Sequence, residues 1–219
     1  MKKYLLCMLL LASTAIPVWA HTINYNLEQQ NSGSVFLEYL GLGFKHILPL
    51  GLDHILFILC VFFLNTNIRS IIKQASMFTV AHTITLGLSM YGFITPPGNI
   101  VEPLIALSIV FLALENLFSK KVHPWRLVMV FLFGLVHGMG FAGALSDLGL
   151  PSNAFAAALI SFNVGVELGQ LSIILLMYFL VSRPFATYPW YRPRLVVPLT
   201  LCIALVAGYW TVERILQNM

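Results

Sequence analysis

Long apolar stretches are the feature that most constrains this chain. An α-helix needs about 20 predominantly apolar residues to cross a bilayer, and six stretches of roughly that length or longer are separated by short polar links. Only 9% of the 219 residues are charged and 59% are hydrophobic, whereas a soluble domain carries roughly 25% charged residues. The sequence therefore predicts an all-α integral membrane protein, a bundle of about six transmembrane helices near residues 48–65, 70–92, 100–119, 126–147, 152–182 and 195–213.

The first 20 residues are typical of a cleavable signal peptide. Lys2 and Lys3 precede an apolar run, and Ala20 ends a small-residue cleavage site. The alternative is an uncleaved first helix. Cleavage would leave residues 21–34 as a polar extracytoplasmic lead before a single six-helix domain at 35–219, with 35–47 as a short helix at the interface. His21 would become the new amino terminus, where it either captures metal through its amine and imidazole or is incidental.

Basic residues predict the orientation of the bundle. Loops rich in Lys and Arg stay in the cytoplasm, and these residues alternate strongly between the two sides. We expect a bacterial-type inner-membrane protein with both mature termini extracytoplasmic. The net charge of +4 then reflects topology and does not indicate a nucleic-acid partner. The expected cytoplasmic set is Arg69, Lys73, Lys120, Lys121, Arg126, Arg183, Arg192 and Arg194, against Lys45 and Arg214 on the other side.

Ionisable residues lie inside these apolar stretches, where each costs several kcal/mol unless it faces a protein interior or a wet cavity. At about 1.5 Å per residue, four different spans deliver a carboxylate or imidazole to a similar depth near the middle of the membrane. A shared site explains this layer better than separate interhelical hydrogen bonds. The candidate metal ligands are His46, Asp53, His54, His82, His137 and Glu167.

Helical spacing adds supporting polar groups. Asn163, Glu167 and Gln170 are spaced i, i+4, i+7 and share one face, and Thr79 and Thr83 accompany His82. Glu115 is nearer the cytoplasmic end, where it is an exit ligand, a proton acceptor or a structural group. Imidazole with carboxylate suits nickel, zinc or cobalt. The three cysteines are isolated in the sequence, which argues against a thiolate site.

Several of these segments together resemble the HupE/UreJ family of membrane proteins, in its second, more divergent branch. The motifs are GFKHILPLGLDH at 43–54, FTVAHTITL at 78–86, FGLVHGMGFA at 133–142 and FNVGVELGQ at 162–170. The resemblance implies about six helices after a cleaved signal, and an association with nickel permeation. The family positions correspond to Asp53, His54 and His137, and to His46 with one additional residue before Asp53.

Three functions fit these observations. The favoured one is a permease for a divalent metal (nickel, or zinc or cobalt), without a nucleotide-binding motif of its own. A second is an intramembrane zinc-dependent hydrolase, with three histidines holding zinc and Glu167 or Asp53 as general base. A third is a structural or assembly protein whose polar layer joins the helices. The bilayer is the expected environment in each case.

Overall fold

The computed structural model describes residues 32–95, 97–148 and 154–217, and these are helical apart from short links. The expected signal peptide and His21 lie outside the described residues. Two π-helical turns, η3 (Tyr178–Ser182) and η4 (Arg192–Val196), flank the short α8 (Arg183–Phe185). The longer helices are α2 (Ser32–Ile47), α3 (Leu52–Phe63), α4 (Ile68–Met90), α5 (Gly98–Phe118), α6 (Trp125–Leu148), α7 (Phe155–Met177) and α9 (Val197–Leu216).

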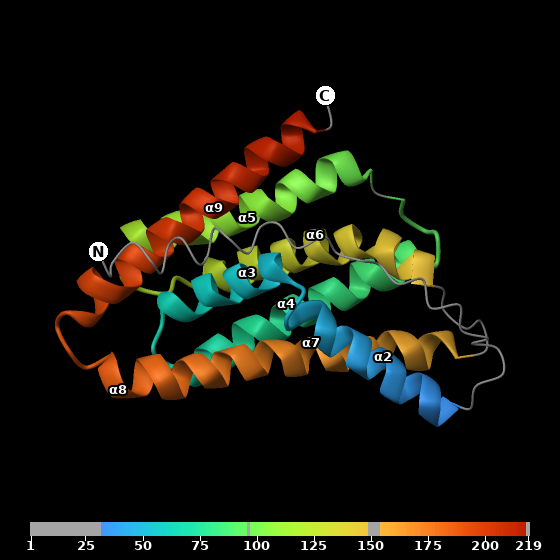
Figure 1. The fold of residues 1–219 in the computed structure, drawn as a ribbon, viewed down its shortest axis with the longest axis horizontal. Coiled ribbons are helices and arrows are strands. Elements are labelled where there is room, and N and C mark those ends of the chain that lie inside the picture. The colour runs from blue at the N-terminus through green and yellow to red at the C-terminus, as the bar shows by residue number, and fades with distance from the viewer. Residues whose placement is uncertain (1–31, 96, 149–153, 218–219) are drawn as a thin grey trace.

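Four segments are long and apolar enough to cross a membrane on their own, at residues 98–118, 125–143, 155–185 and 192–216. The pair α2 and α3, bent by 68°, makes a fifth candidate if it is one broken span. In Figure 1 this pair and α4 run between the same two ends of the bundle as the other spans. The predicted all-α membrane fold is confirmed.

Helix α4 is less apolar than these spans because it contributes much of the polar interior. Its 23 residues extend about 34 Å at 1.5 Å per residue, enough to cross the hydrocarbon core. His82, Thr79 and Thr85 are buried inside the protein, whereas the exposed face carries Val80, Ile84 and Leu88. The polar residues in the middle of α4 therefore point away from lipid, whereas Arg69 and Lys73 are exposed near its first turns, at the basic end of the bundle.

The break between α2 and α3 is built by residues 48–51. A side chain at Gly51 would bring a Cβ to 2.1 Å from the carbonyl oxygen of His46, so only glycine permits this turn. Leu48 N–H donates to the Phe44 carbonyl (2.8 Å) and Gly51 N–H to the Ile47 carbonyl (3.2 Å). These bonds satisfy backbone groups at a depth where lipid offers no partner.

The helices form three packed groups (Figure 1). Helix α2 lies along α7 on one side and α5 lies along α9 on the other, with α3, α4 and α6 between them. The expected interfacial helix at 35–47 is thus part of the bundle, because α2 packs on α7. The bend places the start of α3 against α4, which brings the polar residues of three helices to one point.

Candidate metal centre

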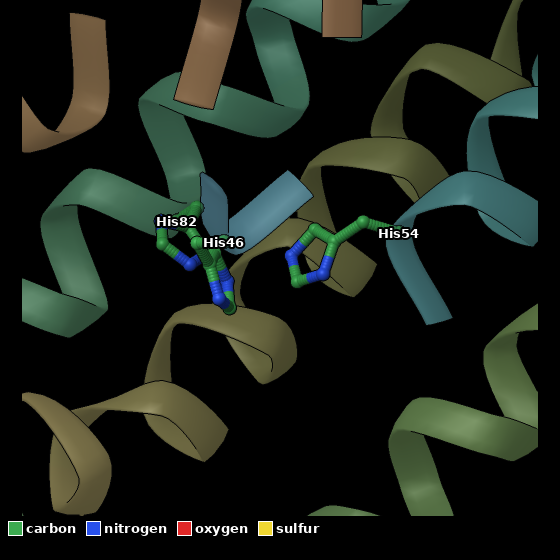
Figure 2. A group of neighbouring side chains, drawn as sticks. All are labelled: His46, His54 and His82. Carbon is green, nitrogen blue, oxygen red and sulfur yellow. The ribbon is translucent and has the colours of Figure 1, made fainter. Parts of the chain in front are cut away.

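Three histidines from three helices converge at the break. His46 ends α2, His54 lies in the first turn of α3 and His82 lies in α4, and one ring nitrogen of each is within 4.8 Å of the others. Figure 2 shows the three imidazoles directed toward a common point. Their ring centroids are 4.6 Å apart for His46 and His54, 5.9 Å for His54 and His82, and 6.2 Å for His46 and His82. The arrangement offers three nitrogen ligands to one ion.

The hydrogen bond of His82 determines which nitrogen is available. Asn163 in α7 donates through its Nδ2 to the Leu159 carbonyl at 2.8 Å, which turns its Oδ1 toward His82. That oxygen can only accept, so His82 Nδ1–H donates to it at 3.1 Å. The lone pair of the neutral imidazole is then on Nε2. Metal-binding histidines are held in the same way through their other nitrogen.

A fourth histidine lies next to the cluster, and its Nδ1 also donates a hydrogen bond to a protein oxygen. His137 Nδ1–H donates to the Phe133 carbonyl one turn earlier in α6, at 2.8 Å, which again leaves Nε2 as the acceptor. Its ring centroid is 5.1 Å from that of His54. His137 therefore borders the three-histidine group from a fourth helix.

The Nε2 atoms of all four histidines are buried, and none has a hydrogen-bond partner among the described residues. Buried polar atoms are almost always paired, and exceptions call for an explanation such as a ligand or ion. Four coincident exceptions at one place, each on a ring nitrogen that can bind a metal, fit a site for a metal ion.

Aromatic rings form the wall of the cluster. Phe141 lies against His46 with centroids 3.8 Å apart and stacks on Phe162 at 5.1 Å. Phe78 contacts His54 (5.7 Å) and His137 (4.9 Å). These apolar walls strengthen electrostatic interactions inside by excluding water.

Asp53 lies beside the cluster in sequence but has a different partner. Arg214, near the end of α9, donates from Nη2 to both carboxylate oxygens of Asp53, at 3.1 and 3.0 Å. Its Nη1 donates to the Glu102 carbonyl at 3.1 Å. The structure thus brings this expected ligand to a cation of the protein, at a partly exposed position.

Glu167 lies apart from the three-histidine group, on the α4–α7 interface toward the basic end. Ser76 Oγ donates to its Oε1 at 2.6 Å, while its Oε2 is buried without a partner. Thr79 donates to Gln170 Oε1 at 3.3 Å. Ser76 is six residues from His82, about 9 Å along α4 at 1.5 Å per residue. The supporting stripe is present, and it continues away from the histidines. The Thr83 hydroxyl donates to the Thr79 carbonyl within α4, at 2.7 Å.

Glu115 pairs with Arg126, a fully buried guanidinium at the start of α6. Arg126 also donates to Gln74 Oε1 at 2.9 Å and to the Cys60 carbonyl at 3.0 Å. These contacts join α3, α4, α5 and α6 at one end of the bundle. The sequence pattern predicts only that Arg126 lies on the cytoplasmic side of the membrane, and it does not predict this role. The role is visible in the structure, where Arg126 is buried beside Gln74 and Glu115.

The fold and the site together define a polytopic helical membrane protein with a histidine cluster inside the bundle. Comparison with family models matches residues 22–214 to the HupE / UreJ protein family. The chain belongs to this family, which is associated with nickel and cobalt uptake. Neither the curated proteins nor the solved structures include a significant match.

Proposed function

We propose that this protein is a membrane permease for a divalent transition metal, with nickel as the first candidate. The observation that carries the proposal is the convergence of His46, His54 and His82, each with a buried, unpartnered Nε2. Family membership supports nickel or cobalt as cargo.

The ligand set suits transport of borderline metals. Imidazole binds nickel, cobalt and zinc, and the three neutral rings replace part of the ion's hydration shell without adding a fixed negative charge. Conduction requires a site that attracts the ion yet releases it. A neutral cluster meets that requirement better than a group of carboxylates, which would hold a divalent cation more firmly.

The position of the cluster also supports a permease. Transporters commonly bind their substrate near the midplane, at helices that are interrupted there. His46 and His54 flank the interruption between α2 and α3, part-way along the bundle in Figure 1. His137 then serves as an additional ligand or as the next stop for the ion.

The orientation of the protein in the membrane follows from the basic residues. The segments that carry Arg69, Lys73, Lys120, Lys121, Arg126, Arg183, Arg192 and Arg194 gather at one end of the bundle, where α4, α6 and α9 begin. Such an end stays cytoplasmic. In this orientation Asp53 lies toward the outside, and Glu167 and Glu115 lie on the inner side of the histidines.

A zinc-dependent hydrolase is less well supported. That mechanism needs a carboxylate free to act as a general base beside the metal-bound water. Asp53 is held by Arg214, and Glu167 accepts from Ser76 at about two turns' distance from His82 along α4. The permease proposal uses the histidines without such a base.

Uptake of radioactive nickel by cells that lack their own nickel importers tests the proposal. His54→Ala and His82→Ala should abolish uptake. His123→Ala is the matched control, because His123 is exposed in the loop before α6, and it should transport normally. Normal uptake by both cluster variants, with the protein present in the membrane at wild-type amounts, would contradict the proposal.

A further inference from the structure

We infer that Arg214 is an entrance latch that competes with the incoming metal ion for Asp53. This inference rests on the proposed permease function and adds a residue that sets how tightly the ion is captured. The latch consists of the Arg214 guanidinium, the Asp53 carboxylate and the Glu102 carbonyl.

The geometry of the pair leaves Asp53 occupied. Both carboxylate oxygens accept from Nη2 of Arg214, at 3.1 and 3.0 Å, and Nη1 is anchored on the Glu102 carbonyl at 3.1 Å. The guanidinium thus ties α9 to the first turn of α3 and to α5. In contrast to the histidine Nε2 atoms, Asp53 already has a cationic partner, so an ion that binds Asp53 competes with the guanidinium.

The latch lies on the accessible side of the cluster. The side chains of Arg214 and Asp53 are 20% and 28% exposed, whereas His54, the next residue after Asp53, is 6% exposed. Arg214 is in the last turn of α9, at the end of the bundle opposite the starts of α4 and α6. An ion approaching from that end meets Asp53 before it meets His54.

The guanidinium also lies over an aromatic ring while it holds Asp53. Its central carbon is 5.6 Å from the Trp210 ring, one helical turn earlier in α9. An arginine over an aromatic face is stabilised by the ring's quadrupole. When a divalent cation takes Asp53, the guanidinium can stay over Trp210 without entering the cluster.

The sign of the effect follows from charge. A guanidinium beside Asp53 neutralises the carboxylate and repels a divalent cation, so binding of the ion must displace it. Replacing Arg214 by a neutral residue removes both penalties. Metal should then bind more tightly, and the gain should be larger while Asp53 is present, because only then does the ion also gain a carboxylate ligand.

Nickel binding to the purified full-length protein, prepared without a histidine tag and titrated calorimetrically, tests the latch. Arg214→Gln should lower the apparent Kd about five-fold, or about 1 kcal/mol. Arg214→Lys keeps the charge but cannot contact Asp53 and the Glu102 carbonyl through two separate nitrogens. It should lower Kd by only about two-fold, since exposed ion pairs are weak. Arg194→Gln, exposed at the other end of the bundle, should leave Kd unchanged.

A double-mutant cycle separates the latch from a structural role. In the Asp53→Asn background, Arg214→Gln should have a smaller effect on Kd than in the wild-type background, because only the repulsion between guanidinium and ion is then removed. An unchanged Kd for Arg214→Gln, or the same shift with and without Asp53, would overturn the latch while leaving the permease intact. If Arg214→Gln does not accumulate, Arg214→Met, which is also neutral, takes its place with the same expected decrease in Kd of about five-fold. Failure of the wild-type protein to bind nickel would overturn both proposals.

Discussion

Replacement of Asn163 by leucine should weaken metal binding without touching a metal ligand. The Asn163 side chain makes two hydrogen bonds, to the Leu159 carbonyl and to His82 Nδ1. Leucine has a similar volume but accepts no hydrogen bond, so His82 loses the contact that fixes its tautomer and ring orientation. The lone pair on Nε2 is then no longer directed to the cluster.

The expected size follows from this single lost contact. Loss of the group that orients a metal-bound histidine typically costs about 10- to 100-fold in affinity, or about 1.4 to 2.7 kcal/mol. Asn163→Asp is the matched control because a carboxylate oxygen can still accept from His82 Nδ1–H. We expect that variant to retain most of the affinity.

The assay is a competition titration of nickel between the detergent-solubilised protein and a chromophoric chelator. Asn163→Leu should bind nickel with a Kd at least about ten-fold higher than that of the wild-type protein. The Kd of Asn163→Asp should be close to the wild-type value. A Kd for Asn163→Leu within about two-fold of wild type, with unchanged thermal stability, would refute the tautomer argument. Equal losses in both variants would point to packing instead of hydrogen bonding.

Three further predictions concern the bundle. Gly138→Ala places a Cβ 2.3 Å from the His82 carbonyl oxygen, whereas Gly208→Ala meets no atom within 4 Å; only the first should lower the thermal midpoint, by overpacking worth about 1–3 kcal/mol. Arg126→Met leaves Glu115 as an unpaired buried charge and should lower the free energy of unfolding in detergent by about 3–5 kcal/mol. Adding Glu115→Gln should restore part of this loss. An equal loss in the single and the double variant would refute the ion-pair argument. A reporter enzyme that is active only outside the cytoplasm should be active when fused to the carboxyl terminus, and inactivity would reverse the orientation.

The helices could be predicted from the sequence because each apolar stretch is bounded by polar links or by Pro and Gly. The bend was signalled by Pro49 and Gly51, but its consequence for α2 was not. A helix that packs along α7 and one that lies at the interface have similar amphipathic patterns. Only the fit of α2 to its neighbour distinguishes them.

The sequence predicts only one property of the site, which is how deep each candidate residue lies in the membrane. Counting residues along each span predicts that His54, His82 and His137 lie at a similar depth, whereas His46 is expected in the short helix at the interface. The structure brings all four histidines together. Counting does not give the rotation of each helix or its lateral neighbours. For that reason Asp53 and Glu167 were grouped with the histidines, although the structure gives them Arg214 and Ser76 as partners.

Both arginines illustrate the same limit. Arg126 and Arg214 were assigned from the positive charge of loops, a rule that concerns only which side of the membrane a residue faces. Arg214 is 161 residues from Asp53, and no local pattern connects residues at that separation. Their roles depend on which helices lie side by side.

X-ray absorption at the nickel edge of the loaded, untagged protein tests the central claim most directly. We expect the scattering pattern of three imidazole rings on one nickel ion in the wild-type protein, and of two rings in His82→Ala. His123→Ala should reproduce the wild-type spectrum. Nickel bound only through oxygen, or a wild-type spectrum that is unchanged in His82→Ala, would contradict a metal site formed by His46, His54 and His82.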